Sequence, residues 1–145
     1  MPTNLLFWTL QLPGWVLFLY LVIAQCTSAV NYRLGVQMGT QEPSEQITQV
    51  GVAFWWAMAF GDLVFYTPIL GLGLLGQLFC TSWATPVLSA ALGITIYWPI
   101  VSLATVVKAR NAPGWSLPKE RDYWKVLPLI SIWGCWGLML ICLGV

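Results

Sequence analysis

The chain has 145 residues, of which 59% are hydrophobic and 8% are charged, and its net charge is +1. Soluble domains carry about a quarter charged residues, so this composition excludes an ordinary soluble protein and predicts an integral membrane protein. A net charge so close to zero gives no reason to expect nucleic acid as a partner. At this length we expect a single transmembrane domain, residues 1–145, with no separate soluble domain.

The sequence contains no histidine, which removes several kinds of chemistry at once. Haem or chlorophyll held by imidazole, a zinc site of histidine and cysteine, and a Ser-His-Asp triad are all excluded. The four cysteines show no C-x-x-C or metal-ligand spacing, so we interpret them as small residues compatible with lipid: Cys26, Cys80, Cys135 and Cys142. We therefore expect no metal site.

Four apolar segments predict four membrane helices, at about residues 5–30, 50–75, 86–107 and 123–145. The first segment has no basic residues before it and is too long for the apolar part of a signal peptide, so we expect a retained helix. In the polar loop 31–49, Ser44 and Glu45 indicate a helix start, with Ser44 as the cap. The fold class predicted is an all-α integral membrane protein, an antiparallel four-transmembrane-helix bundle.

The distribution of basic residues predicts the orientation of the chain in the membrane. With four crossings, the loops after the first and third helices lie on one side, and they hold all six basic residues: Arg33, Lys108, Arg110, Lys119, Arg121 and Lys125. The positive-inside rule places these loops in the cytoplasm and both termini outside, and we expect a bacterial inner membrane. The same residues can bind anionic lipid head groups, but a pure topology signal is the favoured interpretation.

Small residues recur at helical spacing and indicate close helix packing. The second helix carries Ala53, Ala57 and Gly61 at every fourth position, and the third carries Ser89 and Gly93. On the fourth helix, Ser131, Gly134 and Gly137 repeat every third residue. Stripes of this kind let backbones approach closely in lipid. The sequence does not distinguish packing within the chain from contact with a second protomer.

The acidic residue Asp62 is the most informative residue of the apolar segments. It lies about 12 residues after Val50, roughly 18 Å along a helix axis and near the middle of a hydrocarbon core about 30 Å thick. A carboxyl group there is costly, so it should face protein or water. Tyr66, one turn further on, is placed to donate a hydrogen bond to it, and Thr67 adds a hydroxyl. Gln11 and Gln25 on the first helix are further candidate partners.

Two interpretations of this polar cluster differ in kind. Intramembrane acids often mark proton or cation paths, which predicts a proton- or cation-binding site at Asp62. The alternative is a protonated or hydrogen-bonded carboxyl that fixes helix packing. We favour the structural role because proton pathways usually need relays, and the apolar segments hold no second acid and no histidine.

The ten tryptophans raise the question of a hydrophobic ligand. Most are near predicted membrane boundaries, where aromatic belts are common. Four lie deeper: Trp55, Trp56, Trp133 and Trp136. Packing is the simpler explanation for these, and a flat or flexible apolar ligand such as a quinone, a pigment or a lipid is the other. No motif specifies a cofactor.

These observations predict a small non-catalytic membrane protein. The leading hypothesis is a structural or accessory subunit that contacts lipids and packs against other integral membrane proteins or against itself. The alternative is a component of a proton- or cation-coupled transporter or channel that uses Asp62. A lipid-modifying enzyme is least favoured because no nucleophile and base can be paired without histidine.

The orientation can be tested by labelling introduced cysteines. In a chain whose four native cysteines are replaced, cysteines at Thr3 and at Asn111 should react with an impermeant thiol reagent from opposite sides of the membrane, because the two positions flank three crossings. Labelling of both positions from the same side would mean that the number of crossings between them is even.

Overall fold

The computed structural model describes residues 5–144, and these residues contain helices and no strand. The helices are α1 (Leu5–Val30), α2 (Tyr32–Gln37), α3 (Ser44–Gly61), the π-helical turn η1 (Asp62–Tyr66), α4 (Thr67–Leu78), α5 (Ala84–Ala109) and α6 (Glu120–Cys142). The prediction of four long apolar helices is confirmed, since four continuous stretches are long and apolar enough to cross a membrane: Leu5–Val30, Ser44–Leu78, Ala84–Ala109 and Glu120–Cys142. Thr3 and the predicted helix end at Val145 lie outside the described residues.

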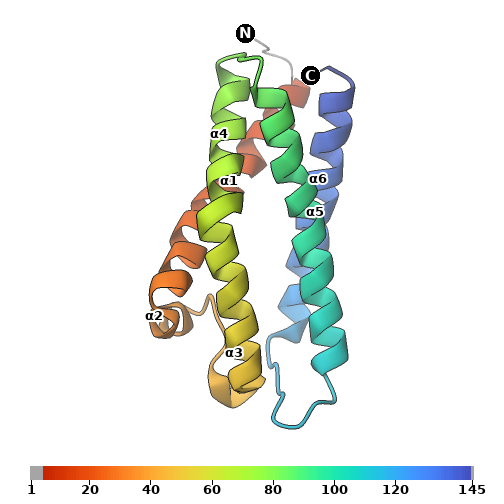
Figure 1. The fold of residues 1–145 in the computed structure, drawn as a ribbon. Helices are drawn as coiled ribbons and strands as arrows, with labels where there is room; N and C mark the ends of the chain where they lie inside the picture. Colours follow the sequence, from red (N-terminus) through yellow and green to blue (C-terminus); the bar gives the residue numbers. More distant parts are fainter. Residues whose placement is uncertain (1–4, 145) are drawn as a thin grey trace.

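The long helices lie side by side and the chain turns back between them (Figure 1). The start of α1, the α4–α5 connection and the end of α6 lie at one end of the molecule. The short helix α2 and the α5–α6 connection lie at the other. We call this second end, with residues 31–47 and 108–125, the basic end, because it holds every lysine and arginine of the chain.

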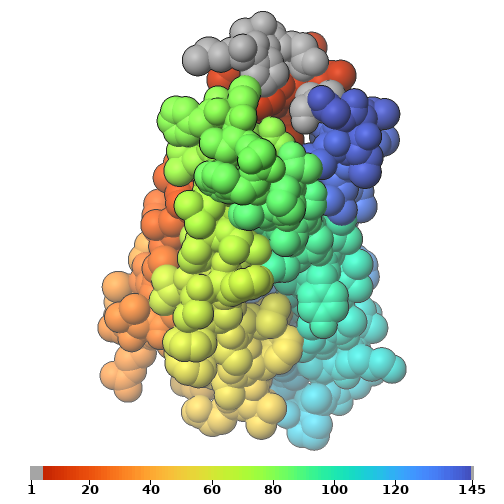
Figure 2. Space-filling model, turned by 45° about the horizontal axis from the view of Figure 1, so that its top comes forward, coloured from red at the N-terminus to blue at the C-terminus, as the bar shows by residue number. Residues whose placement is uncertain are grey.

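The helices α4, α5 and α6 form the most closely packed part of the molecule. α5 packs most extensively against α6 and against α4, while α1 contacts α3, η1 and α4 and has a smaller contact with α6. Figure 2 shows α3, α4 and α5 on one face, with α1 along one flank and α6 along the other. Buried leucines fill the middle of the bundle, among them Leu10, Leu70, Leu88 and Leu92.

Close helix contacts are made at glycines, but not at those of the predicted second-helix stripe. A methyl group on Gly73 of α4 would lie 2.8 Å from Cα of Leu88 on α5. On α6, Gly134 and Gly137 are buried, and a methyl group on either would lie 2.9 Å from an α5 side chain. At these positions the absence of a side chain allows the backbones to approach.

The stripe predicted on the fourth helix contacts α5, but the stripes predicted on the second and third helices make no close contact within the described residues. Ala53, Ala57 and Gly61 are all exposed, and nothing lies within 4 Å of a methyl group built on Gly61. Gly93 on α5 is likewise exposed with open space around it, and Ser89 is only partly buried. These residues therefore lie on the outer surface of the bundle.

The segment predicted as a polar loop, residues 31–49, contains the short helix α2, and the start of α3 differs from the prediction. Asn31 caps α2 by accepting a hydrogen bond from the Leu34 N–H at 3.3 Å. Ser44 does not cap α3, whose N-cap is Pro43. Instead the helix is interrupted at Thr48, where φ is 64°, a strained value for a β-branched residue, and the Thr48 hydroxyl accepts the Gly51 N–H at 3.4 Å.

The glycine contacts can be tested with a matched pair of substitutions. Gly73→Ala forces a methyl group against the α5 backbone and should lower the free energy of unfolding in mild detergent by about 1–3 kcal/mol. Gly93→Ala adds the same methyl group in open space inside α5 and should leave it unchanged or raise it by up to about 1 kcal/mol, because alanine is the better helix former. Equal effects of the two substitutions would contradict the α4–α5 packing described above.

Candidate functional site

Asp62 is buried at an irregular turn of the second candidate membrane-spanning stretch, Ser44–Leu78. It begins the π-helical turn η1, in which the Thr67 N–H bonds to the Asp62 carbonyl five residues earlier. The Asp62 side chain is 6% exposed. Single π turns insert one residue into a helix and occur frequently at functional sites. Pro68, which has no N–H to donate, lies two residues after the end of this turn and is a local sequence signal for it.

The hydrogen bonds predicted for Asp62 are not formed. The Tyr66 hydroxyl lies 2.6 Å from the Thr95 hydroxyl of α5, which donates to the Ala91 carbonyl at 2.8 Å. The Tyr66 hydroxyl therefore bonds to α5 and not to the carboxyl group of Asp62. The Thr67 hydroxyl is buried without a partner among the described residues. The carboxyl group makes no hydrogen bond or ion pair within residues 5–144, and its electrostatic neighbours there are the hydroxyls of Tyr20 and Tyr66.

The two predicted glutamine partners lie away from Asp62. Gln11 is fully buried and donates to the Leu74 carbonyl of α4 at 3.3 Å, while its amide oxygen accepts from Trp15 at 2.9 Å. Gln25 lies toward the basic end, and its amide oxygen is 3.5 Å from the Gln41 amide nitrogen. A glutamine amide can form hydrogen bonds with a backbone carbonyl or with another side chain at any depth in the bundle. The positions of Gln11 and Gln25 on one helix face therefore did not identify their partners.

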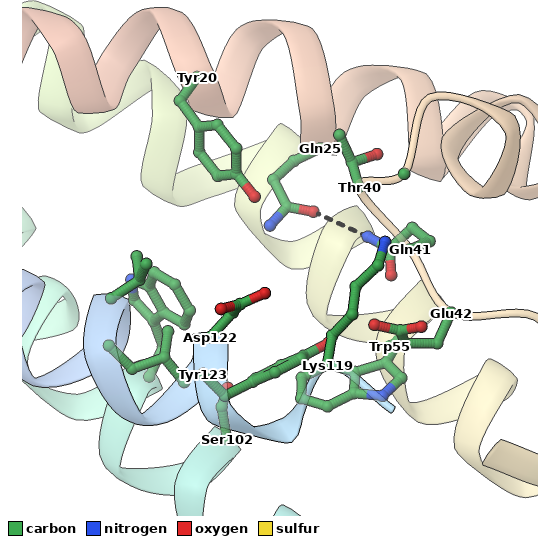
Figure 3. A pocket seen from close by; sticks show the side chains of 14 residues that line it. Tyr20, Gln25, Thr40, Gln41, Glu42, Trp55, Ser102, Lys119, Asp122 and Tyr123 are labelled. Carbon is green, nitrogen blue, oxygen red and sulfur yellow. Dashed lines mark hydrogen bonds between the residues drawn. The ribbon is translucent and has the colours of Figure 1, made fainter. Parts of the chain in front are cut away.

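A polar cavity of about 360 Å³ lies at the basic end (Figure 3). Its walls come from α1, from the segment between α2 and α3, and from α3, α5 and α6, and they include these polar and aromatic residues: Tyr20, Gln25, Thr40, Gln41, Glu42, Trp55, Trp98, Ser102, Lys119, Asp122 and Tyr123. The Tyr20 hydroxyl, the Gln25 amide and the Asp122 carboxylate point toward its open centre. Of the six basic residues predicted to bind lipid, only Lys119 lines the cavity.

Glu42 is the most buried charged residue of the polar cavity. It is 6% exposed, and its carboxylate makes no hydrogen bond or ion pair with any described residue. The Tyr32 hydroxyl holds its backbone carbonyl at 2.9 Å, which keeps the residue turned inward. Burial raises the pKa of Glu42, and the Lys119 ammonium nearby partly offsets that increase. Burial together with the Glu42 charge raises the pKa of Tyr32 to about 12.

Aromatic rings form the inner wall of the polar cavity. The rings of Trp55 and Tyr123 are tilted by 41° with their centroids 5.9 Å apart. The Trp55 indole nitrogen and the Ser102 hydroxyl are buried without a hydrogen-bond partner among residues 5–144. Unpaired buried polar groups typically cost about 1–3 kcal/mol each, so this wall is not optimised for stability alone.

An apolar groove of about 680 Å³ continues from the polar cavity along the seam between α1 and α6. The groove and the cavity share four lining residues: Tyr20, Trp98, Val126 and Leu127. The remaining wall of the groove is almost entirely hydrocarbon and is formed by Leu12, Pro13, Val16, Leu17, Leu129, Ile130 and Trp133. The polar cavity and the apolar groove therefore form one elongated site with a polar end and an apolar end.

Two tryptophans of α6 close the far end of this seam. Pro13 cannot donate to the Thr9 carbonyl, and the indole nitrogen of Trp133 donates to that carbonyl at 3.3 Å. The Trp136 indole donates to the Thr9 hydroxyl at 2.9 Å. Of the four deep tryptophans, Trp55 and Trp133 thus line the elongated site, while Trp56 and Trp136 are used in packing hydrogen bonds.

Comparison with known proteins gives no independent indication of function. No protein-family model matches the chain, and no curated protein or solved structure matches it either. Within residues 5–144, no three His, Cys, Asp or Glu side chains come close enough together to hold a metal ion. The chemistry of the cavity and groove is therefore the basis for any functional proposal.

The unpaired carboxyl group of Asp62 leads to a stability prediction. Because Asp62 makes no hydrogen bond, Asp62→Leu should raise the free energy of unfolding in mild detergent, by about 1–3 kcal/mol. Tyr66→Phe, four residues away, removes a real hydrogen bond and should lower it by about 1 kcal/mol. A loss of stability in Asp62→Leu would mean that the carboxyl group holds the helices together after all.

Proposed function

We propose that this chain is a small non-catalytic integral membrane protein that binds one membrane lipid between α1 and α6. In this proposal its helices cross the membrane as a single antiparallel four-helix bundle. The basic end faces the cytoplasm and both termini face out, in a bacterial inner membrane. The six-to-none distribution of lysine and arginine between the two ends of the bundle supports this orientation.

The continuity of the polar cavity with the apolar groove is the observation that carries the proposal. A lipid has a polar head joined to hydrocarbon chains, and the two parts of the site have the same order and share Tyr20, Trp98, Val126 and Leu127. Their volumes fall in the range of about 300–1,000 Å³ that small-molecule sites occupy. The groove runs along a membrane-facing seam, so a lipid chain can enter sideways from the bilayer.

The residues around the site favour binding over chemical conversion. None of the four cysteines lines the cavity or the groove. Ser102 does line the cavity, but its hydroxyl has no base within hydrogen-bonding distance among the described residues. A serine nucleophile needs such a base to react at neutral pH.

The outer surface supports a role as an accessory subunit or a homo-oligomer. The stripe formed by Ala53, Ala57 and Gly61 is exposed along α3 and is not used by the helices of this chain. Small residues on a lipid-facing helix allow a helix of another protein, or of a second copy, to approach closely. In this role the bound lipid would belong to a larger membrane assembly.

Proton or cation transfer through Asp62 is the second candidate function. Its support is a buried, unpaired carboxyl group at a π turn, with Tyr20 lying between it and the polar cavity. Intramembrane acids without a structural partner are commonly functional. Proton or cation flux into reconstituted vesicles that disappears in Asp62→Asn would favour this candidate, whereas lipid binding alone predicts no flux in either chain.

Lipid binding can be tested by native mass spectrometry of the protein released from its membrane in mild detergent. The wild-type chain should carry one lipid, and Val16→Trp, which fills the groove, should reduce that adduct about tenfold or more. Ile100→Trp adds the same side chain at a similarly exposed position outside the site and should keep the lipid. A wild-type chain without lipid, or equal retention in both variants, would refute the proposed function.

A further inference from the structure

The charged groups of the polar cavity indicate which lipid head group it accepts. Glu42 and Asp122 carry negative charge and Lys119 carries positive charge. Among the described residues, the cavity lining contains no other Asp, Glu, Lys or Arg. Asp122 is exposed at the mouth, where Lys125 lies 3.7 Å away. Glu42 is buried deeper and has no ion-pair partner. The two carboxylates outnumber the one ammonium that lines the cavity, and the Glu42 carboxylate is unpaired, so a further positive group beside Glu42 would be stabilised.

We propose that the cavity recognises the head group of a zwitterionic phospholipid that ends in a primary ammonium. The ammonium binds beside Glu42 and against the aromatic wall of Trp55 and Tyr123, and the phosphate binds Lys119. This inference rests on the proposed lipid-binding function and adds the chemical identity of the head group.

Glu42 and Lys119 give a zwitterion one charged partner for each of its ends. The two side chains influence each other electrostatically, yet they form no direct ion pair. Figure 3 shows them on the same side of the cavity, with Lys119 extending past Gln41. A head group with its own positive and negative ends can place each charge next to its opposite without breaking an existing ion pair. An anionic head group would gain only Lys119 and would meet two carboxylates.

The hydrogen-bonding groups favour a primary ammonium over a quaternary one. A primary ammonium has three N–H donors. Acceptors line the cavity from two segments: the Tyr20 hydroxyl and the Gln25 amide oxygen come from α1, and the Gln41 amide oxygen and the Glu42 carboxylate come from the segment between α2 and α3. A quaternary ammonium cannot use these acceptors and depends on enclosure by aromatic faces. Here Trp55 and Tyr123 form a tilted pair beside the hydrogen-bond acceptors, which a primary ammonium can use and a quaternary one cannot.

The position of Glu42 is built into the fold of the basic end. Tyr32 on the short helix α2 holds the Glu42 carbonyl, and the Thr40 hydroxyl donates to the Gly35 carbonyl at 3.1 Å. From the other side, the Ser116 N–H donates to the Gln46 carbonyl at 2.6 Å and fastens the α5–α6 connection to the start of α3. These hydrogen bonds position the backbone around Glu42 and leave its carboxylate free to face the cavity.

The proposal can be tested by competition between lipids. The full chain is incubated in mild detergent with equal amounts of phosphatidylethanolamine, phosphatidylcholine and phosphatidylglycerol of identical acyl chains, and the bound lipid is identified by native mass spectrometry. Phosphatidylethanolamine should be bound in preference to each of the others by about tenfold or more. In Glu42→Gln this preference should disappear while one lipid is still bound, because the groove is intact.

Matched variants separate the possible failures. Glu45→Gln removes an exposed carboxylate three residues away and should keep the preference for phosphatidylethanolamine. Lys119→Gln, an exposed substitution that leaves the core unchanged, should weaken binding of all three phospholipids. Equal binding of the three lipids, or preference for phosphatidylglycerol, would refute the head-group inference and leave the lipid-binding function standing. If the wild-type chain binds no lipid, or binds only lipid that Val16→Trp does not displace, both the head-group inference and the lipid-binding function are refuted.

Discussion

The close contact of α5 with α4 and α6 is the constraint on which the rest of the structure depends. Gly73, Gly134 and Gly137 allow these three helices to approach with little side-chain volume between them. In lipid there is no hydrophobic force to bring helices together, so such close packing supplies much of the association energy. The helix α1 completes the bundle with larger side chains and meets α6 only in part. The groove lies at this looser seam.

Sequence patterns predicted the long helices well because span length and apolar composition are set by the bilayer itself. They gave the packing face of the fourth helix but not those of the second and third. The stripe at Ala53, Ala57 and Gly61 and the contact at Gly73 lie on the same membrane-spanning stretch, yet η1 inserts a residue between them. That insertion rotates everything after Gly61 relative to everything before it. Spacing alone shows which small residues share a helix face, but not which face a neighbouring helix covers.

The candidate site was harder to predict because its parts are distant in the sequence. The importance of Asp62 could be anticipated from a charge in an apolar segment, but its neighbour Tyr20 could not. Glu42 looked like an ordinary loop acid. Its burial depends on the Tyr32 hydroxyl and on a backbone hydrogen bond between Gln46 and Ser116, which are contacts between segments that no local pattern connects.

Tyr20 links the two candidate functions physically. It lines both the polar cavity and the apolar groove, and its hydroxyl is an electrostatic neighbour of Asp62. Under the proposed function, a lipid head group in the cavity would displace water beside Tyr20 and would lower the local dielectric constant near the carboxyl group of Asp62. A charged Asp62 then becomes more costly. Under the proposed function, lipid binding therefore closes the route by which a proton or cation would reach Asp62 from the basic end, so transfer through Asp62 requires the lipid-free chain.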